Sequence, residues 1–160
     1  MQIGDRIPSA TLARLANGAV EPVSLQPLLA GRRAVIVGIV GAFTPVCTQE
    51  HAPEFVTKAQ RLRTMGYDQI VCLAPNDPWT VDAWARHLGA PDDVLFLSDG
   101  NLDFARALGL TVMARDHHLG ERPRRYLLLT RDNVIERLTM EPDLTSVTCT
   151  GADAVEGEPS

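Results

Sequence analysis

Residues 34–40 read AVIVGIV, seven residues in a row without a charge. β-Branched side chains and unbroken apolarity are typical of a strand that is covered on both faces, as in a parallel sheet. The following residues, 41–48, read GAFTPVCT and predict a compact turn. Apolar residues then recur with helical spacing from Phe55 to Leu62, and Gly66 is expected to end that helix. This stretch therefore predicts a buried strand that leads into a helix through a short turn.

The rest of the chain repeats this alternation. Uncharged apolar runs predict further strands, helical spacing predicts further helices, and Asn-Gly and Asp-Asn pairs predict hairpin turns. Strands that alternate with helices and end in a hairpin indicate an α/β fold with a mixed sheet. The expected elements are strands over 69–74, 94–97, 126–130 and 134–138, helices over 80–88 and 102–108, and hairpin turns at 17–18 and 132–133.

Length and composition predict one globular domain over residues 1–160, because the chain is 45% hydrophobic and 22% charged. The last ten residues, 151–160, are small and acidic, and we expect a flexible tail there. Twenty acidic against 15 basic residues give a net charge of −5, which excludes the basic footprint of a nucleic-acid binder or an anionic-membrane binder. With neither an apolar run of membrane-spanning length nor a signal-peptide pattern, the sequence predicts a cytoplasmic location and no membrane partner.

Three cysteines, Cys47, Cys72 and Cys149, are too few for a disulfide scaffold. Their spacing includes no Cys-x-x-Cys pair, which excludes a thioredoxin-type dithiol and a zinc ribbon. Three readings remain open: structural thiols, one reactive thiol, or two thiols that the fold brings together.

Cys47 is the candidate for a reactive thiol, because it follows a buried strand and opens a helix. Free backbone N–H groups and the positive end of the helix dipole favour a thiolate at such a place. Thr44 lies three residues earlier in the same turn, so its hydroxyl can reach the sulfur. The alternatives are that Cys47 is a buried inert cysteine and that Thr44 only caps the helix.

The segment IVGAFTPVCTQEHAPEF, residues 39–55, resembles the active-site segment of the peroxiredoxins of the type-5 or type-II subgroup. That subgroup carries the run P-G-A-F-T-P-x-C-[ST]-x-x-H-x-P-x-F. Further matches follow the subgroup's order along nearly the whole chain. They are IGDRIPSATL at 3–12, Asn76-Asp77-Pro78-Trp79 with Asp82-Ala83-Trp84, Arg125-Tyr126, and Glu141-Pro142-Asp143 with Thr148-Cys149.

The resemblance implies a thioredoxin-like fold and a thiol peroxidase that reduces hydrogen peroxide and organic hydroperoxides without metal or other cofactor. Cys47 would attack the peroxide, with Thr44, its own backbone N–H and Arg125 as activating and orienting groups. Arg122 and Arg124 are close by, and any of the three arginines could instead be a solvated surface residue. Cys149 matches the resolving cysteine of animal-type, atypical two-cysteine members, which forms a disulfide with Cys47 in the same chain. The alternative is resolution by an outside thiol, with Cys149 as a bystander.

The resemblance also implies a reductant, which would be thioredoxin, glutaredoxin or a low-molecular-weight thiol, and a homodimer formed through the active-site edge. One residue departs from the pattern: the proline that starts the family's run is Val40 here. Valine keeps an apolar cover but restores a backbone N–H and frees φ, which puts the shielding of the thiolate in question.

Two rival functions stay open at this point. The first is a redox-sensing or binding module with weakened catalysis, suggested by Val40. The second is a cysteine hydrolase in which His51, four residues after Cys47, acts as the base. A packing or hydrogen-bonding role is expected for His51, a structural role for Cys72, and an exposed loop rather than a metal site for His117-His118.

Overall fold

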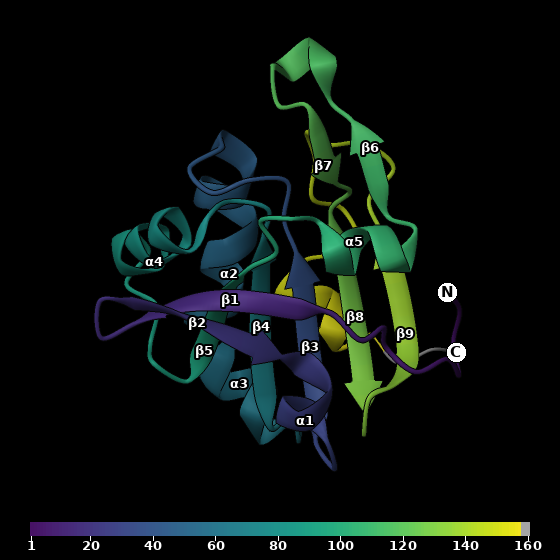
Figure 1. Ribbon diagram of the computed structural model, residues 1–160. Helices are drawn as coiled ribbons and strands as arrows, with labels where there is room; N and C mark the ends of the chain where they lie inside the picture. Colours follow the sequence, from purple (N-terminus) through teal and green to yellow (C-terminus); the bar gives the residue numbers. More distant parts are fainter. Residues whose placement is uncertain (158–160) are drawn as a thin grey trace.

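A seven-stranded mixed sheet forms the centre of the protein, whose computed structural model describes residues 1–157 (Figure 1). The strand order is β2-β1-β5-β4-β3-β8-β9. The three central strands run parallel to one another, and the strands on either side of them pair antiparallel, which makes the mixed sheet that the sequence predicts. The strands are β1 (Thr11–Ala16), β2 (Ala19–Ser24), β3 (Arg33–Gly38), β4 (Gln69–Ala74), β5 (Val94–Ser98), β8 (Tyr126–Arg131) and β9 (Val134–Met140).

Helices cover both faces of the sheet, which explains why the central strands are apolar throughout. Val35 and Val37 of β3 point to one face, where they share a core with α2 (Ala52–Thr57), α3 (Ala59–Thr64) and α4 (Pro78–His87). Ala34 and Ile36 point to the other, where they pack in the core that includes α1 (Leu25–Leu29) and α5 (Asp103–Leu108). The β3 strand ends at Gly38, two residues before the end of the predicted run.

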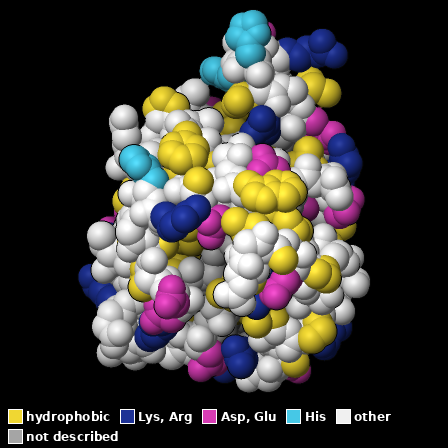
Figure 2. Space-filling view, turned by 60° about the vertical axis from the view of Figure 1, so that its left-hand side comes forward, with side chains coloured by type: hydrophobic (Ala, Val, Ile, Leu, Met, Phe, Trp, Pro, Cys, Tyr) yellow, Lys and Arg dark blue, Asp and Glu magenta, His cyan; other side chains and the backbone are white. Residues whose placement is uncertain are grey.

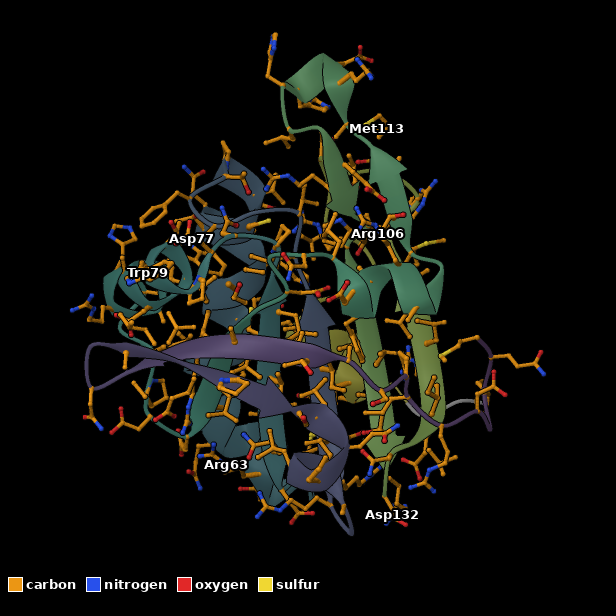
Figure 3. All side chains as sticks on the ribbon, in the orientation of Figure 1. Arg63, Asp77, Trp79, Arg106, Met113 and Asp132 are labelled. Carbon is orange, nitrogen blue, oxygen red and sulfur yellow. The ribbon has the colours of Figure 1, made fainter. Side chains whose placement is uncertain are left out.

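Local turn chemistry fixes several ends of these elements. Asn17 and Gly18 both have positive φ, 50° and 77°, as a tight hairpin turn between β1 and β2 requires. The Asp77 side chain accepts a hydrogen bond from the Thr80 backbone N–H at 2.8 Å and so caps α4 (Figure 3).

Gly38 allows β3 and β8 to pair beside the candidate site. A Cβ at this position would lie 2.1 Å from the Cε1 atom of Tyr126, which is its partner across the two strands. Tyr126 is fully buried and follows Arg125 directly. The absence of a side chain at Gly38 therefore lets the Tyr126 ring lie over the strand end.

A small second sheet was not predicted from the sequence. It consists of β6 (Thr111–Met113) and β7 (Glu121–Pro123), joined by a loop with the 3₁₀ turn η2 (Arg115–His117), and it projects beyond one end of the main sheet (Figure 1). An ion pair between Arg106 of α5 and Glu121 of β7 ties it to the main body (Figure 3). Strands of three residues are too short to show a period-2 alternation, so the sequence offers no signal for them.

The C-terminal segment packs against the core rather than extending from it. Ala152 and Val155 belong to the 3₁₀ helix η3 (Ala152–Val155) and are buried in the cluster that holds α2 and α3. The Ala152 backbone N–H donates to Glu54 Oε2 at 2.8 Å. The prediction of a flexible tail over 151–160 is therefore wrong for residues 151–157, and residues 158–160 lie outside the described part. Among residues 1–157, no helix has the length and apolarity that crossing a membrane requires.

Candidate active site

Cys47 lies where the loop after β3 enters the helical segment that leads to α2. It opens the wide turn η1 (Cys47–His51), in which the Ala52 backbone N–H bonds to the carbonyl of Cys47, five residues earlier. Its side chain is fully buried. Thr48, the next residue, accepts a hydrogen bond on Oγ1 from the Nε1–H of buried Trp84 at 3.1 Å. Cys47 therefore lies at the start of η1, and a hydrogen bond from α4 fixes this turn.

Arg125 supplies the positive charge at this sulfur. It immediately precedes β8, is 1% exposed, and donates from Nη1 to Cys47 Sγ at 3.1 Å. Among the described residues, no other arginine bonds to this sulfur. Arg122 bonds instead to the carbonyls of Val40 and Leu119. A guanidinium in this position places a permanent positive charge and an N–H donor directly at the sulfur.

His51 accepts a hydrogen bond from the same nitrogen of the Arg125 guanidinium that donates to Cys47. Its Nδ1 accepts from Arg125 Nη1 at 3.1 Å, so the ring proton sits on Nε2, which donates to the Thr150 carbonyl at 2.9 Å. Burial lowers the pKa of His51 to about 4, which the bond to Thr150 opposes and the charge of Arg125 assists. Both ring nitrogens bond to other groups and, within the described residues, neither bonds to Cys47 Sγ, which argues against His51 as the base of a cysteine hydrolase. Its hydrogen-bonding role, expected from the sequence, is confirmed.

The Thr44 hydroxyl donates to the Gly41 carbonyl at 2.6 Å. It makes no side-chain capping bond to the helical segment, so the capping alternative is not observed. Because this bond uses the only hydroxyl hydrogen, the Thr44 oxygen is available as an acceptor. It lies at the wall of a pocket, where it can receive the O–H of a bound peroxide.

This pocket, of about 320 Å³, opens beside the buried thiol. Most of its surface is apolar, and Arg125 is one of the few polar residues that line it. The Nε atom of Arg125 is buried and has no hydrogen-bond partner in residues 1–157, which leaves an N–H free to donate. Val40 is buried in the wall and contributes an apolar side chain there. The lining residues are Val40, Thr44, Pro45, Val46, His117, Leu119, Arg125, Leu144 and Thr145.

Two large apolar side chains are exposed near this edge. Phe43, in the turn before Cys47, is 50% exposed with a φ of 61°, and Trp79 at the start of α4 is 59% exposed. The Phe43 ring lies 5.5 Å from the His87 ring, centroid to centroid. Figure 3 shows Trp79 on the outer side of α4, and Figure 2 shows hydrophobic side chains gathered on this face below the β6–β7 hairpin.

Cys149 lies in the segment after β9, and its sulfur contacts the Met140 carbonyl at 3.5 Å. It is a partly exposed free thiol, and Cys47 is free as well. Burial is the main cause that raises the pKa of Cys149. The structure therefore connects Thr150, next to Cys149, to Arg125 through His51, but it does not join the two sulfurs.

Sequence reasoning missed two residues of this region, Glu141 and Leu144. The buried carboxylate of Glu141 accepts hydrogen bonds from residues 148–150, and the Leu144 carbonyl accepts from Arg125 Nη2 at 3.1 Å. Glu141 belongs to the Glu-Pro-Asp match, which was the only signal available for it.

The remaining candidates lie where they were expected. Cys72 of β4 is buried in the same apolar cluster as Cys47, and burial raises the pKa of its thiol far above the usual range. His117 and His118 are exposed on the hairpin loop. Within residues 1–157, no group of three or more His, Cys, Asp or Glu side chains is placed to hold a metal ion.

Helices on both faces of a mixed sheet, with a buried cysteine at a helix start, define a thioredoxin-like fold. The sequence profile of the Redoxin family matches residues 2–155. The chain is 41% identical over 145 residues to peroxiredoxin-2E, chloroplastic, of Arabidopsis thaliana, covering 88% of this chain and 62% of that protein. It is 45% identical over 144 residues to peroxiredoxin-2E-2, chloroplastic, of Oryza sativa subsp. japonica, covering 87% and 64%. It thus spans about three fifths of the length of these curated relatives.

Solved structures agree with the sequence comparisons. Reduced Prx3 of Vibrio vulnificus in complex with H₂O₂ superposes with a TM-score of 0.90 at 29% identity, covering 97% of this chain and 96% of that one. The chain belongs to the redoxin family and, within it, to the peroxiredoxins. The fold and family implied by the sequence resemblance are therefore confirmed.

Proposed function

We propose that this chain is a thiol peroxidase that reduces hydrogen peroxide and organic hydroperoxides, with Cys47 as the nucleophile. The observation that carries the proposal is the 3.1 Å bond from the buried Arg125 guanidinium to Cys47 Sγ beside an apolar pocket. Membership of the peroxiredoxins supports it. The rival function, a redox-sensing module, would need a reactive thiol but no groups that bind a peroxide. A pocket that has a hydrogen-bond donor and an acceptor beside the thiol therefore favours the peroxidase.

In the first step, the Cys47 thiolate attacks the terminal oxygen of ROOH. An S–O bond forms, the O–O bond breaks, and the RO⁻ leaving group takes a proton from solvent to give ROH. Sulfur is oxidised by two electrons to a sulfenic acid, and the peroxide is reduced. We expect the unpaired Nε–H of Arg125 and the Thr44 oxygen to orient the peroxide and to stabilise the charge that develops on its oxygens.

In the second step, the Cys149 thiol attacks the sulfenic sulfur of Cys47 and releases water, which leaves an internal disulfide. The partial exposure of Cys149 supports this assignment. Because Cys47 is buried and Cys149 contacts the Met140 carbonyl, the first turn around Cys47 and the segment of Cys149 must both move. Thioredoxin, glutaredoxin or a low-molecular-weight thiol then supplies the two electrons that restore the thiols.

Three further expectations belong to this proposal. The exposed Phe43 and Trp79 beside the site support a homodimer through the active-site edge. The Redoxin match over residues 2–155 supports one domain over residues 1–160. The cytoplasmic location stays a prediction from the sequence, and two of the related peroxiredoxins are named as chloroplastic.

The proposal is tested by following peroxide consumption with a dithiol reductant present. Wild-type protein should consume hydrogen peroxide and an alkyl hydroperoxide, and Cys47→Ser should consume neither. Arg125→Ala should slow the reaction of Cys47 by at least about 100-fold, comparable to the loss of an oxyanion-site donor. Arg124→Ala is the matched control and should react at the wild-type rate. Hydrolysis of an ester or amide without peroxide turnover would contradict the proposal.

A further inference from the structure

The segment from Glu141 to Thr150 serves two parts of the molecule at once. Leu144 and Thr145 form part of the pocket wall, and the Leu144 carbonyl accepts a hydrogen bond from Arg125 Nη2 at 3.1 Å. Cys149 lies near the other end of the same segment. A movement of this segment therefore changes both the substrate pocket and the position of Cys149.

Both ends of the segment meet at Glu141. Its backbone N–H donates to the Arg125 carbonyl at 2.9 Å. Its Oε1 atom accepts from the backbone N–H groups of Thr148, Cys149 and Thr150 at 2.8, 2.8 and 2.9 Å. The hydroxyls of Thr148 and Thr150 add bonds of 2.7 and 2.8 Å. One carboxylate thus closes residues 141–150 into a ring.

The carboxylate in this ring is charged at neutral pH. Glu141 is 1% exposed, and burial alone would raise its pKa, but the hydrogen bonds from Thr148, Cys149 and Thr150 outweigh burial and lower the pKa to about 2. Hydrogen bonds to a buried charge are stronger than neutral ones and costly to break one at a time. They hold the Cys149 sulfur at the Met140 carbonyl rather than at Cys47.

We propose that Glu141 is a positioning residue that latches residues 141–150 and that release of this latch limits how fast Cys149 reaches oxidised Cys47. The proposal rests on the proposed function, in which Cys149 resolves the sulfenic acid. The resolving step forms the S–S bond, breaks the S–O bond and releases the sulfenic oxygen as water with the Cys149 proton.

The latch gives the sulfenic acid a finite lifetime, and two reactions compete during it. Attack by Cys149 yields the disulfide, whereas a second peroxide oxidises the sulfenic acid to sulfinic acid and is itself reduced to water or an alcohol. Glu141 therefore sets the ratio of disulfide to sulfinic acid at a given peroxide concentration. Release of the segment also removes the Leu144 wall, so the pocket opens as Cys149 arrives.

The test measures the products that form after reduced protein is mixed with peroxide. Acid-quenched samples are analysed by intact mass for sulfenic acid, disulfide and sulfinic acid. Glu141→Gln keeps the shape of the side chain but removes its charge and half of its acceptor capacity. We expect disulfide formation to become about tenfold faster, which corresponds to weakening of one or two charge-assisted bonds, and the sulfinic fraction to fall in proportion.

Two further variants make the test specific. Asp143→Asn is the matched control in the same segment, because within residues 1–157 the Asp143 side chain bonds only to Thr145 and Ser146, and it should leave the product ratio unchanged. Thr148→Val removes a single bond from an exposed residue and should give about a threefold acceleration, even if Glu141→Gln does not fold. A merely structural role would lower thermal stability without moving the ratio of disulfide to sulfinic acid.

The outcomes separate this proposal from the one on which it rests. If wild-type protein forms the disulfide and the variants form it no faster, or form it more slowly, the latch is overturned and the resolving role of Cys149 stands. If neither wild-type protein nor any variant forms the disulfide, Cys149 does not resolve Cys47 and the latch falls with it. A disulfide in Glu141→Gln alone would support the latch.

Discussion

At the scale of single residues, Arg125 is shared among three protein acceptors. A guanidinium has five N–H donors. Those of Arg125 serve Cys47 Sγ, His51 Nδ1 and the Leu144 carbonyl, and Nε remains free. The planar fork lets one charge contact the nucleophile, a positioning histidine and the pocket wall simultaneously.

Replacement of Arg125 by lysine should therefore be costly although the charge is kept. An ammonium is a point charge with three donors and cannot reproduce the directions of the fork. We expect Arg125→Lys to slow the reaction of Cys47 with peroxide by about tenfold or more, since misplaced donors lose transition-state stabilisation. Stopped-flow measurement of the first step checks this, and a wild-type rate would show that charge alone suffices.

His51 should make stability depend on pH in a defined window. Its pKa is about 4 in the folded protein and about 6.5 when unfolded, so between these values the unfolded chain binds more protons. The stability that neutral His51 contributes is complete above pH 6.5 and is lost as pH falls toward 4. From pH 7 to pH 5 the loss should be about 2 kcal/mol.

His51→Gln provides the comparison, because glutamine offers a donor and an acceptor but does not titrate. Chemical denaturation at pH 7 and pH 5 should show the wild-type free energy of unfolding falling by about 2 kcal/mol more than that of the variant. If the free energy of unfolding falls equally for the two proteins between pH 7 and pH 5, a group other than His51 causes the acid sensitivity.

The candidate site was only partly predictable at this scale. The placement of Cys47 follows from a local pattern, a buried strand, a tight turn and a helix start. Arg125 was favoured over Arg122 and Arg124 through the family resemblance and through its place directly before the apolar run at 126–130. Glu141 could not be assigned, because its partners at 148–150 depend on how an irregular segment folds back, which no periodicity encodes.

At the scale of elements, most strands and helices that pack on the main sheet were predicted, but α1 and the elements outside that sheet were not. Buried central strands produce uncharged runs, so β3, β4 and β8 were found close to their observed bounds. The short β6 and β7 strands lack such runs, and η3 consists of small and acidic residues. The packing of η3 depends on the buried side chains of Ala152 and Val155, and composition alone does not reveal that these are buried.

The docked η3 helix should contribute to stability. Val155→Ala removes two buried methyl groups from the core beside α3 and should cost about 2 kcal/mol in the free energy of unfolding. Asp153→Asn, which alters only an ion pair with Lys58 at the exposed surface of the same helix, should leave that free energy nearly unchanged. Equal effects would mean that η3 is not packed in solution.

At the scale of the whole molecule, the active-site edge is expected to meet a second copy of the chain. Phe43 keeps a positive φ that is unusual for a bulky residue, and half of its side chain is exposed. Phe43→Glu should place a charge in the apolar contact and shift the protein toward monomer in sedimentation velocity. Met113→Glu, on the exposed β6–β7 hairpin, is the control and should leave the sedimentation coefficient unchanged. A wild-type monomer at high concentration would contradict the dimer.

The hydrogen bond from Trp84 to Thr48 should make tryptophan emission an optical reporter of the redox state proposed for Cys47. Indole emission depends on whether the ring is buried and hydrogen-bonded, and Thr48 sits next to the residue that changes oxidation state. If the turn of Cys47 unwinds on oxidation, as the proposed resolving step requires, Trp84 should lose this partner and its emission should shift. Exposed Trp79 contributes a constant background that Trp79→Phe removes. Such a protein would display each oxidation and each reduction as a fluorescence change in real time, without an added dye.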